Sequence, residues 1–266
     1  MIQLLKKIKL TGIYIFLSIT SLLFLLPLYY VFCLASGGSI DPREGLPHPG
    51  MELFHNISFI LFETDFMSSF TYTISYTLVQ TLLTLIVCAL AGYGFEIYND
   101  TGKDKFFKVI LWTYMVPFTT FVVPMFMIFG DLGMVNTITA MILPFIASPL
   151  IIMVFRQQSR AFPKELIEAA RMDGLQEPFI FLRVYVPNMK STFACGIIIA
   201  FLNAWNSYQW PRIIMQNDEV MSMTVYLTHQ GHGNTMTLIL MSMIPTLIVF
   251  FAFQKYFIEG MKGALQ

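Results

Sequence analysis

Hydrophobic residues come along the chain in long blocks, separated by short polar segments. Each block is about twenty residues long, which is the length that a helix needs to cross a hydrocarbon core about 30 Å thick. The pattern therefore predicts six membrane-spanning helices, at about residues 11–35, 68–95, 109–130, 137–155, 191–211 and 234–254.

Proline lies inside several of these predicted spans. It has no backbone N–H to donate and its ring crowds the preceding turn, so a helix that contains one tends to kink. Kinks are tolerated at membrane depth where neighbouring helices satisfy the freed carbonyl. We expect kinks at Pro27, Pro117, Pro124, Pro144, Pro149 and Pro245.

The composition fits an all-α polytopic membrane protein. Charged residues make up 12% of the 266 positions and hydrophobic residues 56%, whereas a typical soluble domain is about 25% charged. Within the predicted boundaries, none of the spans contains Asp, Glu, Lys, Arg or His. We expect a single transmembrane domain that covers residues 1–266.

Lysine and arginine determine the expected orientation. Six spans place both termini on the same side, and cationic residues collect in cytoplasmic loops. If the N-terminus is cytoplasmic, only Arg43 and Arg212 of the 16 lysines and arginines fall on the outer side. We therefore expect both termini in the cytoplasm, together with the charged loop 156–190 between spans four and five.

The chain lacks the groups that would let it drive transport alone. Ion-coupled carriers usually place ionisable residues at membrane depth, although sodium can also bind through backbone carbonyls. The phosphate-binding pattern G-x-x-x-x-G-K-[S/T] is absent, so ATP cannot bind by that route. A membrane-embedded enzyme would need clustered His, carboxylate or Cys, and the sequence shows none. We expect a non-catalytic chain without cofactor or metal.

The charged loop contains the stretch "FPKELIEAARMDGLQEPFIFLRVYVP", residues 162–187. Pro163 suits the first turn of a helix, and Gly174 suits its end because glycine tolerates a positive φ. We predict a helix of about three turns with Ala169 and Ala170 on one small-residue face, bordered by charged side chains. Such a helix can dock on another protein or lie on the inner leaflet, and the residues alone favour neither.

The same stretch resembles the EAA loop of ABC-transporter permease subunits, whose pattern is E-A-A, three residues, G, nine residues, then I-x-L-P. Glu168-Ala169-Ala170 and Gly174 stand at that spacing, and Val184-Tyr185-Val186-Pro187 close it. In the family this loop forms a coupling helix that seats in a cleft of the ATPase subunit. The resemblance implies that loop 163–187 makes this contact through Glu168, Ala169, Ala170 and Gly174, with their neighbours Leu166, Arg171 and Asp173.

Other stretches resemble the carbohydrate-importing branch of the maltose/maltodextrin type. They are "FRQQSRAFPKELIEAARMDG", "WNSYQWP" and the closing "YFIEGMKGALQ". Glu96 departs from the pattern, because such permeases often carry a basic residue there. The resemblance implies a multi-pass permease in a bacterial or archaeal cytoplasmic membrane. Its expected partners are a second homologous permease, an ABC ATPase dimer that uses ATP and Mg, and an extracytoplasmic solute-binding protein.

A sugar or oligosaccharide is the expected substrate, and importers of glycerol-3-phosphate or of a polyol share the motifs. Sugars are often bound by aromatic faces with polar groups at their edges. An interfacial aromatic belt or hydrogen bonds between helices would also explain such residues without a ligand. The candidates for the substrate path lie near the outer end of span five: Asn203, Trp205, Asn206, Tyr208 and Gln209.

Overall fold

The computed structural model describes residues 2–39, 48–217, 221–229 and 234–263. Within these ranges the regular elements are helices, and no strand is present. The chain divides into two compact units, Met1–Met67 with His229–Ile244, and Ser68–Thr228 with Pro245–Gln266. The expectation of one permease domain over the whole chain stays a prediction. Arg43, one of the two cations expected on the outer side, lies outside the described residues.

The first unit is built on the end of a long helix. It contains α1 (Ile2–Ala35), α2 (Leu53–Glu63) and the first part of α14 (Thr235–Gly263). The carbonyl of Ala35 accepts hydrogen bonds from Asn56 Nδ2 at 3.0 Å and from Thr237 Oγ1 at 3.1 Å. A single backbone oxygen at the end of α1 therefore joins it to both α2 and α14.

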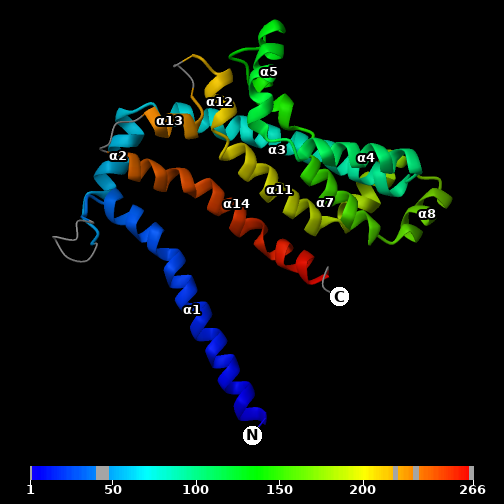
Figure 1. The fold of residues 1–266 in the computed structure, drawn as a ribbon, viewed down its shortest axis with the longest axis horizontal. Helices are drawn as coiled ribbons and strands as arrows, with labels where there is room; N and C mark the ends of the chain where they lie inside the picture. The colour runs from blue at the N-terminus through cyan, green and yellow to red at the C-terminus, as the bar shows by residue number, and fades with distance from the viewer. Residues whose placement is uncertain (1, 40–47, 218–220, 230–233, 264–266) are drawn as a thin grey trace. The chain divides into compact units, whose positions relative to one another are not determined.

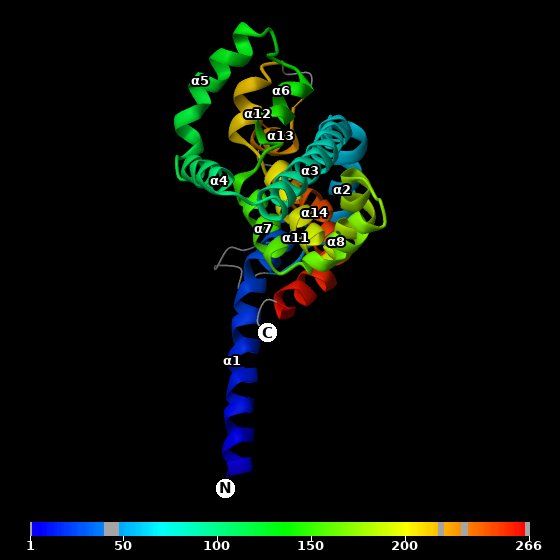
Figure 2. The same ribbon diagram turned by 90° about the vertical axis from the view of Figure 1, so that its right-hand side faces the viewer.

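The second unit contains the remaining helices and the last part of α14. Figure 1 shows α7 and α11 side by side, and Figure 2 shows α12 beside α6. The helices are α3 (Phe66–Ile97), α4 (Thr101–Tyr114), α5 (Phe118–Asp131), α6 (Ile138–Ile142), the 3₁₀-helix η1 (Leu143–Phe145), α7 (Pro149–Arg160), α8 (Lys164–Met172), α9 (Glu177–Ile180), the π-helix η2 (Phe181–Tyr185), α10 (Val186–Asn188), α11 (Lys190–Trp205), α12 (Gln209–Ile214) and α13 (Met223–His229).

The main core of the second unit surrounds Phe155 of α7, which is fully buried. Two glycines let neighbouring helices approach it. A Cβ atom added at Gly92 of α3 would lie 2.5 Å from the Cβ of Phe155, and one added at Gly196 of α11 would lie 3.4 Å from its ring. Small residues commonly allow such close packing between membrane helices. A second core gathers around Trp210, whose Nε1 donates to the carbonyl of Ala140 at 2.9 Å.

The structure confirms three of the predicted spans as single long helices. Lys9–Ala35, Phe66–Ile97 and Thr235–Tyr256 are each long and apolar enough to cross a membrane. The predicted span at 109–130 is not one continuous helix, because α4 and α5 meet at 98°, and the kink expected at Pro117 is confirmed as a break. The break falls at Pro117, which precedes α5 and has no N–H to continue the ladder of α4.

The other two predicted spans also belong to bent helix pairs. In the range 137–155, α6 and η1 join α7 at a bend of 43°, where Pro149 begins α7. The predicted span 191–211 lies within Lys190–Ile214, which meets Glu177–Asn188 at a bend of 86°. The helices long and apolar enough to span therefore number three, or as many as six if each bent pair forms one span, among the described residues.

Gly92 and Gly94 provide a test of the close contact between α3 and α7. Gly92→Ala places its Cβ against Phe155, and we expect overpacking to cost about 1–3 kcal/mol and to lower the Tm in detergent by roughly 2–12 °C. Gly94→Ala is the matched control, because no atom lies within 4 Å of its added Cβ. A Tm for Gly92→Ala equal to that of Gly94→Ala would contradict this packing.

Candidate functional site

The helix predicted within the charged loop is confirmed as α8, which has one buried and one exposed face. Ile167 and Ala170 are buried among the core residues of the second unit. Glu168, Ala169 and Met172 are exposed on the other side. The structure thus separates the two alanines that we expected on one face, because neighbouring residues on a helix point about 100° apart. Ala170 packs against the chain's own core, and Ala169 faces outward.

Met172 is the most exposed apolar side chain of α8, at 89%, and sequence reasoning missed it. It lies three and four residues after Ala169 and Glu168, so the three share one face of the helix. That spacing was the signal that could have identified it. Leu166 is also exposed, at 43%. α8 therefore exposes two apolar side chains besides its charged ones.

Gly174 ends α8 in the way that the sequence predicts. Its φ is +78°, in the left-handed region that glycine adopts without strain. The N–H of Leu175 donates to the carbonyl of Ala170 at 3.0 Å, which satisfies a carbonyl of the last helical turn. No atom lies within 4 Å of a Cβ added at Gly174, so the position requires this backbone conformation and not a small volume. Asp173 beside it is exposed.

Arg171 holds α8 to its own chain. Its Nε donates to Glu177 Oε1 of α9 at 2.7 Å, and its guanidinium lies 5.3 Å from the ring centre of Tyr98. The hydrogen bond to Glu177 raises the pKa of the Arg171 guanidinium above its ordinary value. Tyr93 of α3 donates to the other oxygen of Glu177 at 3.1 Å. Arg171, predicted to contact the ATPase, is therefore bonded within the chain.

Beneath α8 lies an aromatic cluster that contains Tyr185 at its centre. The Tyr185 hydroxyl lies 2.7 Å from Ser159 Oγ of α7, within hydrogen-bonding distance, and its side chain is fully buried. Its ring contacts those of Tyr93, Phe162 and Phe181, with centroid distances of 4.8, 5.5 and 5.3 Å. Tyr185 ends the π-helix η2, a type of turn often found at functional sites. The cluster joins α3 and α7 to the second half of the charged loop.

A cluster of charges joins three helices near the same loop. Glu96 Oε2 accepts from Arg156 Nε at 3.3 Å and from Arg160 Nε at 3.1 Å. Arg156 also pairs with Asp104 of α4, and its guanidinium lies 4.3 Å from the ring centre of Phe107. Arg156 is only 4% exposed. Since a buried charge is costly without a partner, each carboxylate supports the arginine.

Sequence reasoning missed this charge cluster. It identified Glu96 only as a departure from the family's usual basic residue, and it ended the second span one residue earlier. In the structure α3 continues to Ile97, so Glu96 lies in its last turn and is buried. Glu96 and Arg156 each lie one residue beyond the predicted spans 68–95 and 137–155, in helices that continue past those boundaries. The partners lie 52 to 64 residues apart in sequence, a separation at which no local pattern can pair them.

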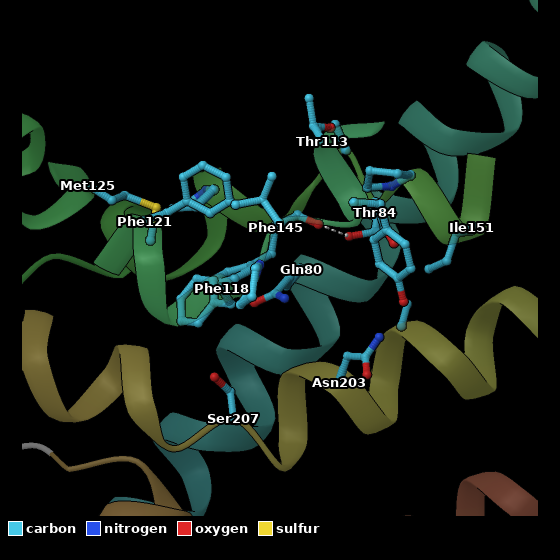
Figure 3. A pocket seen from close by; sticks show the side chains of 18 of the residues that line it. Gln80, Thr84, Thr113, Phe118, Phe121, Met125, Phe145, Ile151, Asn203 and Ser207 are labelled. Carbon is cyan, nitrogen blue, oxygen red and sulfur yellow. Dashed lines mark hydrogen bonds between the residues drawn. The ribbon is translucent and has the colours of Figure 1, made fainter. Parts of the chain in front are cut away.

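The second unit also contains a cavity of about 890 Å³. Figure 3 shows it between α3, the junction of α4 and α5, and α11. Polar side chains reach it from three helices, namely Gln80 and Thr84 from α3, Thr113 from α4 and Asn203 from α11. Thr84 Oγ1 donates to the carbonyl of Phe145 at 3.3 Å. The remaining lining is mainly aromatic and aliphatic.

Of the five residues predicted for the substrate path, Asn203 lines this cavity and the other four do not. Trp205 is buried, where its ring stacks on Phe201 at 5.9 Å. Asn206 donates to the carbonyl of Leu202 at 3.0 Å, within its own helix. Tyr208 is exposed, and Gln209 is partly buried.

Comparison with known proteins gives a consistent result. The family described as "Binding-protein-dependent transport system inner membrane component" matches residues 90–263. The chain is 38% identical over 259 residues to the lactose transport system permease protein LacG of Rhizobium radiobacter, with 95% of each chain covered. It is 33% identical over 262 residues to the arabinooligosaccharides transport system permease protein AraQ of Bacillus subtilis, covering 93% of this chain and 92% of that protein.

Two further matches are more distant. The sn-glycerol-3-phosphate transport system permease protein UgpE of Yersinia pestis is 28% identical over 269 residues, covering 93% of this chain and 94% of that protein. The structure also resembles one chain of a solved bacterial ABC transporter involved in the import of the acidic polysaccharide alginate. The TM-score is 0.80 at 24% sequence identity, and the match covers 94% of this chain and 97% of that chain. This last match shows that the fold is shared.

Glu96→Gln tests the charge cluster. It leaves the buried Arg156 with Asp104 as its one carboxylate, and we expect a loss of roughly 1–3 kcal/mol, as when a buried hydrogen-bonding group loses a charged partner. Thermal unfolding of the purified protein in detergent measures the loss. Asp131→Asn is the control, because Asp131 is exposed at the end of α5 and its replacement should change stability by less than about 0.5 kcal/mol. Equal Tm values for the two variants would show that Glu96 does not stabilise the fold.

Proposed function

The chain belongs to the family of binding-protein-dependent transport system inner membrane components, and from this premise we propose that it is the transmembrane permease subunit of an ATP-driven importer of a sugar or oligosaccharide. The relatives LacG and AraQ, named for lactose and arabinooligosaccharide transport, support a carbohydrate substrate. UgpE supports a second candidate, an importer of glycerol-3-phosphate. An importer of a polyol is a further candidate, because such importers share the same motifs.

The proposed topology has six spans, with both termini and the loop that contains α8 in the cytoplasm. Counting each bent helix pair as one span gives six. The distribution of lysine and arginine supports the orientation, because only Arg43 and Arg212 would face outward. The membrane would be the cytoplasmic membrane of a bacterium or archaeon.

The exposed face of α8 is the observation that supports coupling to an ATPase. Glu168, Ala169 and Met172 point away from the chain, while Ile167 and Ala170 are buried within it. A helix held on one face by its own core presents the other as a rigid docking surface. Because the chain has no phosphate-binding loop, we propose that a separate ABC ATPase dimer hydrolyses ATP with Mg and moves α8.

The remaining partners follow from the same proposal. A second homologous permease would complete the translocation path, and an extracytoplasmic solute-binding protein would deliver the substrate. The chain itself would be a non-catalytic subunit without cofactor or metal. An ion-coupled carrier is a weaker candidate, since Glu96, Arg156 and Arg160 are paired with one another and are therefore poor candidates for a proton relay.

Glu168→Lys and Met172→Glu test the docking surface. Each places an unfavourable charge on the exposed face of α8, and we expect at least a tenfold loss of binding-protein-stimulated ATP hydrolysis by the assembled transporter. Membrane insertion should be unchanged, because neither side chain packs in the core. Glu63→Lys, at the exposed end of α2, is the matched control. Normal stimulation in both α8 variants would rule out the coupling role.

Met172→Cys tests the orientation. A thiol at this exposed position should react with a membrane-impermeant maleimide in inside-out vesicles and stay unlabelled in intact right-side-out vesicles. Cys33 and Cys88 are buried, and replacing Cys195 with alanine removes the partly exposed native thiol. Labelling from the outer side would invert the proposed topology.

A further inference from the structure

The cavity of the second unit contains a buried polar side chain that has no partner. Gln80 is 6% exposed and lines the cavity. None of the residues that the structure describes forms a hydrogen bond with its amide. Leaving a buried amide unpaired is costly, so a side chain of this kind at the middle of a long apolar helix indicates a ligand or water in the cavity.

Asn203 approaches the same space from the opposite helix. Figure 3 shows Gln80 of α3 and Asn203 of α11 on two sides of one opening, with Ser207 close by. The Asn203 amide also lacks a hydrogen bond to any described residue. By contrast, the nearby Asn206 amide bonds to its own helix. Two amides from different helices thus present free donors and acceptors to one cavity.

The other residues that line the cavity indicate which kind of ligand the two amides could bind. Phe118, Phe121 and Phe145 provide apolar faces, and aromatic faces pack well against the C–H surfaces of sugar rings. Asp, Glu, Lys, Arg and His are all absent among the described residues that line the cavity. A side-chain amide both donates and accepts hydrogen bonds, as a sugar hydroxyl does. Each of the two amides can therefore form hydrogen bonds with a sugar hydroxyl.

We propose that this chain itself binds the transported solute in this cavity, and that the solute is an uncharged carbohydrate held by Gln80 and Asn203. The inference rests on the proposed function and deepens it, because it assigns substrate contact to this subunit and selects one of its substrate classes. An anionic substrate would enter an apolar site with no cation to offset its desolvation, which is strongly unfavourable. The volume of about 890 Å³ is near the upper end for small-molecule sites, so it suits a di- or oligosaccharide better than a three-carbon polyol.

The first experiment uses the assembled transporter in proteoliposomes, with its partner permease, ATPase and binding protein. Uptake of a radiolabelled neutral sugar is measured below saturation for Gln80→Leu and Asn203→Leu. Each variant loses one or two neutral hydrogen bonds, so we expect uptake to fall about three- to tenfold. Asn206→Leu, three residues along the same chain, is the matched control and should transport within twofold of the unmodified protein.

ATP hydrolysis stimulated by the binding protein is measured in the same vesicles. It should be retained in Gln80→Leu and Asn203→Leu, which shows that they fold and assemble. If both variants take up sugar at the normal rate while Glu168→Lys abolishes hydrolysis, the binding proposal fails and the proposed function stands. If Glu168→Lys and Met172→Glu both leave hydrolysis intact, the proposed coupling role fails, whatever the uptake results show.

The second experiment identifies the substrate class. The partner binding protein is screened by thermal shift against neutral mono-, di- and trisaccharides, including lactose and arabinotriose, together with glycerol, sn-glycerol-3-phosphate and a uronate disaccharide. We expect a neutral di- or trisaccharide to give the largest rise in Tm and to serve as the uptake probe. A largest rise with an anionic compound or with glycerol, or no rise with any sugar, would overturn the proposal.

Discussion

In a chain as apolar as this one, every buried polar group must find a partner inside the protein, because neither lipid nor a packed core can replace water. Most of the polar side chains at key positions obey this constraint. Arg156 is surrounded by two carboxylates, the Tyr185 hydroxyl lies against Ser159, and the indole of Trp210 donates to a backbone carbonyl. Each pair joins elements distant in sequence, so polar satisfaction also determines which helices meet. The hydroxyls of Thr77, Thr81 and Tyr226 are buried without a partner, and the Gln80 amide, which lines the cavity, also has none among the described residues.

The same constraint explains how α8 would receive force from the proposed ATPase. A docking helix transmits movement only if its inner side is fixed, and here it is fixed by different kinds of contact. Ile167 and Ala170 pack in the core, while the bond from Arg171 to Glu177 reaches α3 through Tyr93. The charge cluster around Glu96 then links α3, α4 and α7 next to it. The exposed face of α8 is free for a partner because the opposite face is fully engaged.

The sequence predicted those features that depend on local chemistry. Twenty-residue apolar blocks located the long helices, and Pro163 and Gly174 bounded α8 almost to the residue. It could not predict features that depend on distant partners. Ala170 appears as a surface residue in the motif, and only the fold shows what covers it. Pro117 and Pro124 are equivalent in sequence, yet the chain breaks at the first and continues through the second. Asn203 and Asn206 both appear as free amides until the path of α11 separates them.

The close approach of Gly92 to Phe155 has a mechanical consequence. With 2.5 Å between an added Cβ and the Phe155 Cβ, no side chain larger than that of glycine fits between the two helices at this point. Sliding would drive side chains into one another, whereas turning about the contact keeps both surfaces packed. Any movement of one helix relative to the other would therefore have to turn about this contact. Since α7 ends at Arg160 and α8 begins at Lys164, a rotation of α7 about this contact would displace α8 farther than the contact itself.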